Sequence, residues 1–335
     1  MTSFNSQVQR VGFACKIQAS HDVPIKQLNT STTTIKWLTA QPKHKAEQRL
    51  WDLTRQNVQA LYQQIAWTGA LPNNQRMFRI TSDLLPAYTH SDWLAFYFEP
   101  GMTTWLEREL LRCGELARKL DVRLSFHPGQ FCVLASENPG VVENSIAEFE
   151  YHADLARYMG YGKQFQDFKI NVHIGGKCGP AGIKQAVRSL SREARNCLTI
   201  ENAEYTWGLD ASLQLMDTCA LVLDIHHHWI ATGEYVKPDD PRITQVVDSW
   251  RGVRPVIHYS CSREDVLVNH DATTKPDLQE LKTVGFTSAR LRAHSDYYWN
   301  QACNHWAATH STWADIMCEA KQKNLAAKQF AEFVQ

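Results

Sequence analysis

The chain has 335 residues, of which 44% are hydrophobic, and its 35 basic side chains balance 35 acidic ones, so it can bury one large core or two modest ones. The absence of net charge gives no global sign of a polyanionic partner, although a local basic groove can lie on a neutral protein. Nine cysteines without a C-x-x-C pair argue against a disulfide framework and against a cysteine zinc site.

The N-terminal segment MTSFNSQVQR lacks the apolar stretch of a signal peptide. No apolar run along the chain approaches the length that spans a membrane. We therefore expect a cytoplasmic protein with reduced thiols and no membrane partner.

Eight short apolar runs have the length of strands, and helical patterns fill most of the gaps between them. A polar stretch at about 16–45 follows the first run and predicts a long loop, and the first long helix covers about 46–67. Apolar residues spaced 4-3-4-3 predict a helix over 106–120, and the last helix lies near 324–334. The predicted strands are VGFAC (11–15), MFRI (77–80), RLSFH (123–127), KINVH (169–173), LTIE (198–201), LVLD (221–224), PVIH (255–258) and ADIMCE (314–319).

Strand–helix alternation over this length predicts an α/β protein with a parallel sheet, either a TIM-type (β/α)8 barrel or an open doubly wound sheet. No G-x-G-x-x-G motif follows the first strand, which argues against the dinucleotide-binding form of the open sheet. We find no linker or internal repeat. The sequence therefore favours a single-domain TIM barrel over residues 1–335.

Six of the predicted strands end in a side chain that can bind a metal ion. In a parallel barrel the carboxyl ends of the strands meet at one face, where active sites form. Imidazoles and carboxylates without thiolates suit zinc or manganese, and a bridging carboxylate allows more than one ion. The pattern predicts a multinuclear metal site at the mouth of the barrel. The six residues are His127, His173, Glu201, Asp224, His258 and Glu319.

Three consecutive histidines, 226–228, follow Asp224. If the strand stops at Asp224 and a helix begins, His227 or His228 lies one turn on, beside the carboxylate. If the strand continues, His226 shares a face with Asp224 instead. Spacing alone leaves these alternatives open, and two of the three histidines are expected to have no direct role.

The motifs along the chain resemble those of the UV damage endonuclease family, in order and over nearly the whole length. The family has a TIM-barrel fold and nicks DNA on the 5′ side of damage, leaving a 3′ hydroxyl and a 5′ phosphate, with a cluster of divalent ions. The matching stretches are NTSTTT (29–34), FRITSDLLPAYTH (78–90), SFHPGQF (125–131), VHIGGK (172–177), LTIENAE (198–204), LDIHHHW (223–229), IHYSCSRE (257–264), RAHSDY (292–297) and DIMCEAK (315–321).

This resemblance implies the cofactor, the partner and the site. The cofactor is a cluster of about three divalent ions, with manganese as first choice and zinc, magnesium or cobalt as alternatives. The partner is damaged double-stranded DNA, bound by a monomer. Glu201 is the candidate carboxylate that bridges two ions, and His90 matches a functional family histidine, as a ligand or a phosphate contact. The implied ligands are His127, His173, Glu201, Asp224, His227, His258, His294 and Glu319.

The resemblance also implies contacts to DNA. The family pair that matches Gln130 and Phe131 probes the duplex at the lesion, and an apolar ring beside an amide suits insertion between stacked bases. Two departures stand out. Val256 replaces a lysine that is common in the family, which would remove a cation from the site. Phe13 and Phe131, both candidates for DNA contacts, replace frequent tyrosines.

The chemistry of phosphodiester cleavage gives the remaining expectations. Bound ions lower the pKa of water and stabilise the leaving oxygen, so no side-chain base of unusual pKa is needed. Lys177, Arg263 and Lys16 are candidates for phosphate contacts, and Asn202 is expected to orient Glu201.

Three alternative functions remain. An abasic-site endonuclease of the endonuclease IV type is the nearest. A metal-dependent sugar isomerase or epimerase on the same barrel would use fewer histidines. A damage-binding protein without catalysis is compatible with Val256.

Overall fold

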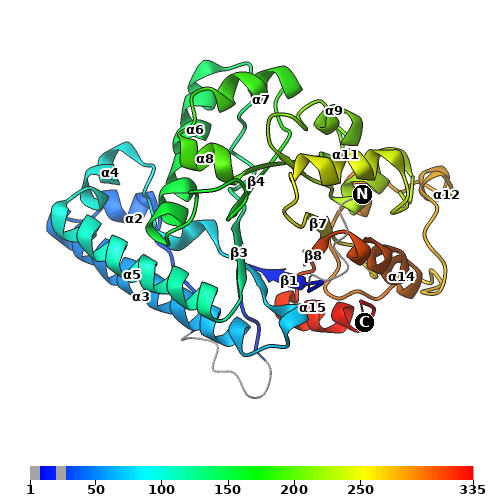
Figure 1. Ribbon diagram of the computed structural model, residues 1–335, viewed down its shortest axis with the longest axis horizontal. Helices are drawn as coiled ribbons and strands as arrows, with labels where there is room; N and C mark the ends of the chain where they lie inside the picture. Colours follow the sequence, from blue (N-terminus) through cyan, green and yellow to red (C-terminus); the bar gives the residue numbers. More distant parts are fainter. Residues whose placement is uncertain (1–7, 20–27, 335) are drawn as a thin grey trace.

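Eight parallel strands form the centre of the structure, a computed structural model that describes residues 8–19 and 28–334 (Figure 1). Each predicted strand is present, with ends that agree within two residues. The strands are β1 (Val11–Ala14), β2 (Met77–Arg79), β3 (Arg123–Phe126), β4 (Lys169–His173), β5 (Leu198–Glu201), β6 (Ala220–Val222), β7 (Val256–Tyr259) and β8 (Asp315–Cys318).

The strands close into a barrel. Their order is β6-β5-β4-β3-β2-β1-β8-β7, and every pair is parallel. The two outer members meet through a parallel bridge between Asp224 and His258, where the His258 N–H donates to the Leu223 carbonyl at 3.0 Å. This closure confirms the predicted TIM-type barrel and excludes the open doubly wound sheet.

Helices surround the barrel and bury their apolar faces against it. The helix predicted at about 46–67 spans 43–69, and the predicted loop at about 16–45 contains a short helix at 35–39, with residues 20–27 lying outside the described part. The helices are α2 (Ile35–Thr39), α3 (Lys43–Gly69), η1 (Asn73–Gln75), η2 (Ser82–Leu84), α4 (Ser91–Tyr97), α5 (Pro100–Lys119), α6 (Pro139–Tyr158), α7 (Gly179–Val187), α8 (Arg192–Cys197), α9 (Leu209–Leu213), α10 (Ile225–Thr232), α11 (Pro241–Ser249), α12 (Leu278–Thr283), α13 (Ser288–Leu291), α14 (Gln301–Thr309), η3 (His310–Thr312) and α15 (Lys323–Ala331).

The two longest N-terminal helices, α3 and α5, lie side by side along one edge of the molecule (Figure 1). The rings of Trp51 and Trp105 meet edge to face, with centroids 5.7 Å apart. On α5, Leu106, Leu110 and Cys113 from the predicted stripe are buried, which confirms the 4-3-4-3 pattern. The two helices therefore pack against each other on the outside of the barrel.

The amino ends of the strands carry a network of arginines around one aspartate, which we call the floor: Arg10, Arg123, Arg254 and Asp315. One Asp315 oxygen accepts from the Arg10 backbone N–H at 2.9 Å and from Arg254 Nε at 2.8 Å. The other accepts from Arg123 Nη1 at 2.7 Å. Both carboxylate oxygens are thus bound by protein donors, so the floor is a closed structural network.

All nine cysteines are free, as their spacing predicted. Among the described residues, no helix is both long and apolar enough to cross a membrane.

Candidate metal centre

The carboxyl ends of the strands bring the predicted ligands together, and we call this set the mouth cluster. His127, Glu201, Asp224, His258 and Glu319 all contribute to it. Three overlapping groups each place their ligand atoms within 4.8 Å of one another. They are His127 with His173 and Glu201, His127 with His258 and Glu319, and Glu201 with Asp224 and His258.

Glu201 lies at the centre of the mouth cluster and is fully buried. Its Oε1 faces Nδ1 of His227 at 3.5 Å and Nδ1 of His173 at 4.0 Å. Its Oε2 faces Nε2 of His127 at 3.3 Å and Nδ1 of His258 at 3.2 Å. Because each oxygen faces a different pair of imidazoles, the carboxylate has the arrangement needed to bridge two cations.

The start of α10 decides among the three consecutive histidines. Asp224 caps this helix by accepting from the His227 backbone N–H at 2.7 Å, so the chain turns helically after the strand. His227 then lies over the cluster, and its Nδ1 donates to the Asn202 carbonyl at 3.2 Å. His228 points the other way and bonds Glu234 at 2.9 Å. Helical geometry therefore selects His227.

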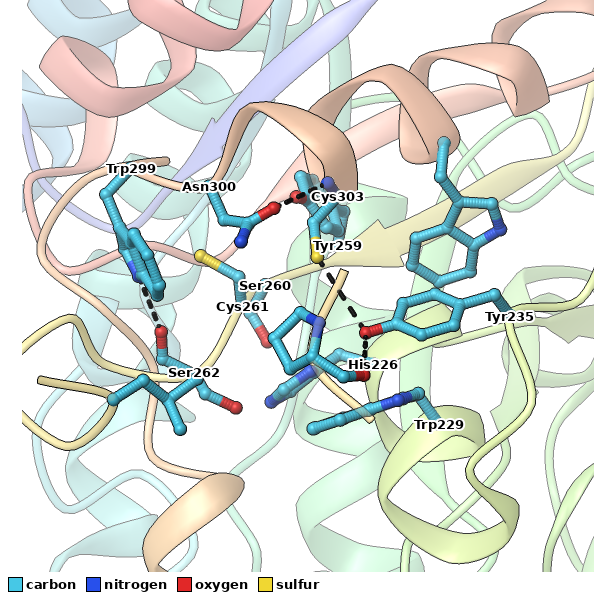
Figure 2. Close-up of a pocket in the computed structure, with 13 residues that line it drawn as sticks. His226, Trp229, Tyr235, Tyr259, Ser260, Cys261, Ser262, Trp299, Asn300 and Cys303 are labelled. Carbon is cyan, nitrogen blue, oxygen red and sulfur yellow. Dashed lines mark hydrogen bonds between the residues drawn. The ribbon is translucent and has the colours of Figure 1, made fainter. Parts of the chain in front are cut away.

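His226 lines a small cavity, shown in Figure 2. Its ring stacks on Trp229 with centroids 5.7 Å apart, and Tyr235 and Ser260 also line the cavity. The cavity volume is about 20 Å³, which has room for little more than one water molecule. This wall of aromatic and small polar side chains makes His226 a core residue.

Several buried polar atoms of the mouth cluster have no hydrogen-bond partner: Glu201 Oε1, Asp224 Oδ2 and His258 Nδ1. Buried polar atoms are almost always paired, so three orphans in one cluster require an explanation. All three are lone-pair donors that a divalent cation would satisfy. The donor set of imidazoles and carboxylates therefore fits a metal centre.

Hydrogen bonds behind the imidazoles fix which nitrogen faces the cluster. Nδ1 of His127 donates to the Pro128 carbonyl at 3.0 Å, and Nδ1 of His294 donates to the Glu319 carbonyl at 3.0 Å. Each bond leaves Nε2 with its lone pair available, which is the usual arrangement behind a metal-binding histidine. His294 lies beside Glu319 through this bond but belongs to none of the three ligand groups among the described residues.

The protonation states differ across the mouth cluster. Although burial favours the neutral ring, Asp224 and Glu201 raise the pKa of His227 to about 9, so a cation that binds there has to displace a proton. Burial lowers the pKa of His127 to about 3, so its imidazole is neutral at physiological pH. The pKa of Asp224 is raised by burial, whereas histidines His258 and His173 overcome the effect of burial and lower the pKa of Glu201. The positive charge near Asp224 and Glu201 is thus too small to keep both buried carboxyl groups ionised, and divalent ions would supply the missing charge.

Two basic side chains lie inside the barrel beside these groups, and the sequence analysis did not identify either. Arg79 forms an ion pair with Glu319. Lys169 Nζ lies 3.0 Å from Nε2 of His258, and burial, with Arg79 nearby, lowers the pKa of Lys169 to about 7. A neutral amine can accept the Nε2–H of His258, which leaves Nδ1 of that ring for a metal ion. A lysine at the head of the buried strand KINVH was the available signal.

Val256 is buried at the start of β7 in a small apolar cluster that includes Met77 and Trp250. However, Lys169 brings an amine to His258 from β4.

Two expectations need correction. Phe13 was expected to contact DNA, but it is 2% exposed and packs against Trp67 and Phe78, because all of β1 is covered by helices and neighbouring strands. Asn202 bonds the backbone of Asp224 rather than the Glu201 carboxylate.

His90 caps α4 by accepting from the Asp92 N–H. It belongs to none of the ligand groups found among the described residues, and its role as a ligand or a phosphate contact stays a prediction.

The other candidate DNA contacts are accessible. Phe131 is 85% exposed on the loop after β3, next to exposed Gln130. Lys177 is exposed and Arg263 is partly exposed, and each is paired with an acid, Glu137 and Asp265 respectively.

Comparison with known proteins identifies the family. A profile of the UV-endonuclease UvdE family matches residues 9–333. The chain belongs to this family. It is an endonuclease of the UV DNA damage type by this membership, and its TIM barrel is the fold shared with the structural neighbours.

Two relatives illustrate the distance within the family. A UV DNA damage endonuclease of Bacillus cereus is 24% identical over 335 residues, which cover 96% of this chain and 93% of the relative. One of Bacillus anthracis is 24% identical over 302 residues, covering 87% and 84%.

Solved structures agree on the fold. The crystal structure of SacUVDE superposes with a TM-score of 0.72 at 23% identity, covering 97% of each chain. Endonuclease IV from Thermus thermophilus superposes with a TM-score of 0.53 at 14% identity, covering 82% of this chain and 92% of that one.

Proposed function

We propose that this chain nicks the DNA backbone on the 5′ side of UV photoproducts, leaving a 3′ hydroxyl and a 5′ phosphate, with divalent ions held by the mouth cluster. The observation that carries the proposal is the position of Glu201, whose two oxygens face separate pairs of histidines in a buried site with orphaned lone pairs. Such a site is suited to a substrate that is itself an anion.

The proposed ligands are His127, His173, Glu201, Asp224, His227, His258, His294 and Glu319. Three overlapping groups of ligand atoms support about three ions. Nitrogen and oxygen donors without thiolates support manganese first, with zinc, magnesium or cobalt as alternatives.

Each residue has a defined task in the reaction. Divalent ions at this centre would lower the pKa of water and offset the charge that develops on the leaving oxygen. Glu201 would hold two binding positions at a fixed separation, because its two oxygens face different imidazoles. Arg79 holds Glu319 in place through their ion pair. The Asn202 carbonyl holds His227 at Nδ1, the nitrogen that also faces Oε1 of Glu201, and so fixes the position of the ring at the edge of the centre.

The proposed partner is damaged double-stranded DNA, bound by a monomer inside the cell. Phe131 would enter the base stack at the lesion and Gln130 would contact the base edges. Three side chains would contact phosphates: His90, Lys177 and Arg263. On binding DNA, Lys177 and Arg263 would exchange their present carboxylate partners for phosphate groups.

A nicking assay tests the proposal. Duplexes that carry one defined photoproduct, one abasic site or no lesion are incubated with manganese, with magnesium, and after chelation. The proposal requires metal-dependent nicking of the photoproduct duplex on its 5′ side. Nicking of the abasic duplex alone would favour an endonuclease IV activity, and tight lesion binding without nicking would favour a damage-binding protein. Turnover of sugars with no effect on DNA would favour an isomerase.

Substitution of the probing pair tests lesion recognition separately. Gln130→Ala should reduce the preference for damaged over intact duplex by roughly tenfold, since one good base contact contributes about 1–3 kcal/mol. The rate at saturating damaged DNA should change much less, because Gln130 lies outside the mouth cluster. Equal losses on both duplexes would contradict the probing role. Lys163→Ala, an exposed residue between α6 and β4, serves as the surface control.

A further inference from the structure

The inward face of β4 carries polar side chains where a barrel interior usually holds branched apolar ones. Lys169, Asn171 and His173 alternate along the strand, so all three side chains point to the same side. Asn171 is fully buried, and so is Thr199 on the neighbouring strand β5. Two buried polar side chains below the mouth cluster cost stability unless they are paired.

These two residues form a chain of hydrogen bonds that ends on Glu201. Asn171 Nδ2 donates to Oε2 of Glu201. Thr199 Oγ1 donates to Oδ1 of Asn171 at 2.8 Å. The strands β4 and β5 are in register here, with Asn171 paired to Thr199, which brings the side chains together.

The direction of this chain follows from the hydrogen-bonding capacity of each group. An ionised carboxylate only accepts, so the amide must turn its NH₂ group toward Glu201. The amide oxygen then faces Thr199, whose hydroxyl has one proton to donate. A reversed amide would place two acceptors, Oδ1 and Oε2, against each other. The carboxylate therefore sets the orientation of the amide. The threonine hydroxyl holds the amide in that orientation by donating to Oδ1 at 2.8 Å, a shorter contact than its 3.3 Å approach to the Ile170 carbonyl.

We infer that Asn171, held in orientation by Thr199, is a positioning residue that fixes the plane of the Glu201 carboxylate. The amide occupies one lone pair of Oε2 from below. The remaining lone pair of Oε2 then points toward His127 and His258, and Oε1 is left for the side of His173 and His227. This inference rests on the proposed metal centre, because it assigns to these residues the separation of two binding positions.

The inference predicts a graded loss of metal affinity. Groups that orient a ligand from behind typically change metal affinity by about 10-fold to 100-fold. Asn171→Leu removes the donor and should weaken manganese binding by roughly 100-fold. Thr199→Val keeps the shape of the side chain but removes the hydroxyl that donates to Oδ1 of Asn171, so the amide is held less firmly, and affinity should fall by roughly tenfold. Thr199→Ser retains the hydroxyl and should bind as the parent chain does.

The experiment compares two quantities for each variant, beginning with metal-stripped full-length protein. Calorimetric titration with manganese gives the affinity, and thermal unfolding without metal gives the stability. Thr68→Val is the matched control, because Thr68 is equally buried and donates to the Gln64 carbonyl within α3, away from the mouth cluster. The control should lose stability with no change in affinity.

The outcomes separate this inference from the proposal beneath it. If the parent chain binds no divalent ion, the proposed metal centre is wrong and the inference falls with it. If the parent binds manganese but Thr199→Val and Asn171→Leu bind within twofold of it, only the inference is overturned. Loss of metal-free stability in both variants without loss of affinity would likewise show a structural role alone. Weakened binding in Thr199→Val that Thr199→Ser restores supports the inference, even if Asn171→Leu fails to fold.

Discussion

The two ends of the barrel both bury charged clusters, but they treat their carboxylates in opposite ways. At the floor, Asp315 receives three donors from arginines, and both of its oxygens are occupied. At the mouth cluster, one oxygen of Glu201 and one of Asp224 have no donor at all. At the floor, protein donors occupy both oxygens of the carboxylate. In the mouth cluster, carboxylate oxygens remain that only a cation would pair.

This difference shows where function lies in a fold that offers many buried polar groups. A buried polar network whose hydrogen bonds are all made stabilises the fold. Buried polar atoms that lack partners and lie together can instead bind a ligand, here a cation. A search for charge alone would have selected the floor as readily as the mouth cluster.

The difference between the two ends is tested most directly by removing one carboxylate charge from each. Glu201→Gln, at the mouth cluster, should have the largest effect on nicking. The amide offers one acceptor where the carboxylate offers two, so it cannot bridge two cations, and we expect nicking to fall by at least about 1000-fold, or about 4 kcal/mol. The metal-free protein should unfold cooperatively at nearly the parental temperature, because Glu201 Oε1 has no partner to lose. Nicking rates and thermal unfolding measure the two effects.

The control for this variant is Glu234→Gln, which changes a carboxylate that bonds His228 outside the mouth cluster. Nicking by Glu234→Gln should remain within a few-fold of the parent. A Glu201→Gln protein that nicks at the parental rate would show that the mouth cluster is not the reaction centre.

At the floor, Asp315→Asn should show the reverse pattern. Removing one partner from a buried ion network leaves uncompensated charge, and we expect a loss of about 4 kcal/mol in the free energy of unfolding. Nicking below the unfolding temperature should persist, because Asp315 lies at the opposite end of the strands. Urea unfolding and nicking at low temperature provide the two measurements. A variant with full stability but no nicking would contradict the division between the two ends.

Strand positions and the six strand-end residues that meet at the mouth were accessible from the sequence because they depend on local pattern. The runs such as LTIE and KINVH mark their own strands, and a residue at the end of a parallel strand must lie at the mouth of a barrel. The choice of His227 needed the Asp224 cap, a local feature that a D-x-x-H motif implies.

Contacts across the barrel were not accessible in the same way. Lys169 meets His258 from a distant strand, and Asn171 meets Glu201 through register alone. Phe13 was misassigned because an aromatic residue in a short strand gives no sign of which face is covered. Contacts of this kind depend on how the strands are paired in the closed barrel, and no local sequence pattern predicts that pairing.

A buried histidine next to the floor, His310, should make the free energy of unfolding depend on pH. His310 uses both ring nitrogens as a neutral imidazole: Nε2 donates to the Val236 carbonyl, and Nδ1 accepts from Trp313 Nε1. Burial lowers the pKa of His310 to about 4. The unfolded chain, with a pKa near 6.5, binds the extra proton first, so the free energy of unfolding should fall as pH drops from about 6.5 to about 4.

The contribution of His310 reaches at most about 3 kcal/mol at the acid end of this window and vanishes above it. His310→Gln keeps a neutral donor and acceptor and should flatten that part of the pH dependence. Urea unfolding at pH 7, 5.5 and 4.5 gives the difference between parent and variant, in which the other histidines cancel. Parallel curves for the two proteins would refute the assignment.

Manganese should act on the mouth cluster and leave the floor unchanged, which gives the smallest but most selective test. A ligand that binds only the folded chain adds about 2.7 kcal/mol at 100 times its dissociation constant. For a chain of this size the unfolding temperature should rise by about 4 °C. Asp315→Asn begins from a lower temperature but should gain the same increment, because its ligands are intact. Glu201→Gln should gain much less. Equal increments in all three proteins would mean that manganese binds elsewhere, and a loss of the increment in Asp315→Asn would mean that the two ends of the barrel are one cooperative site.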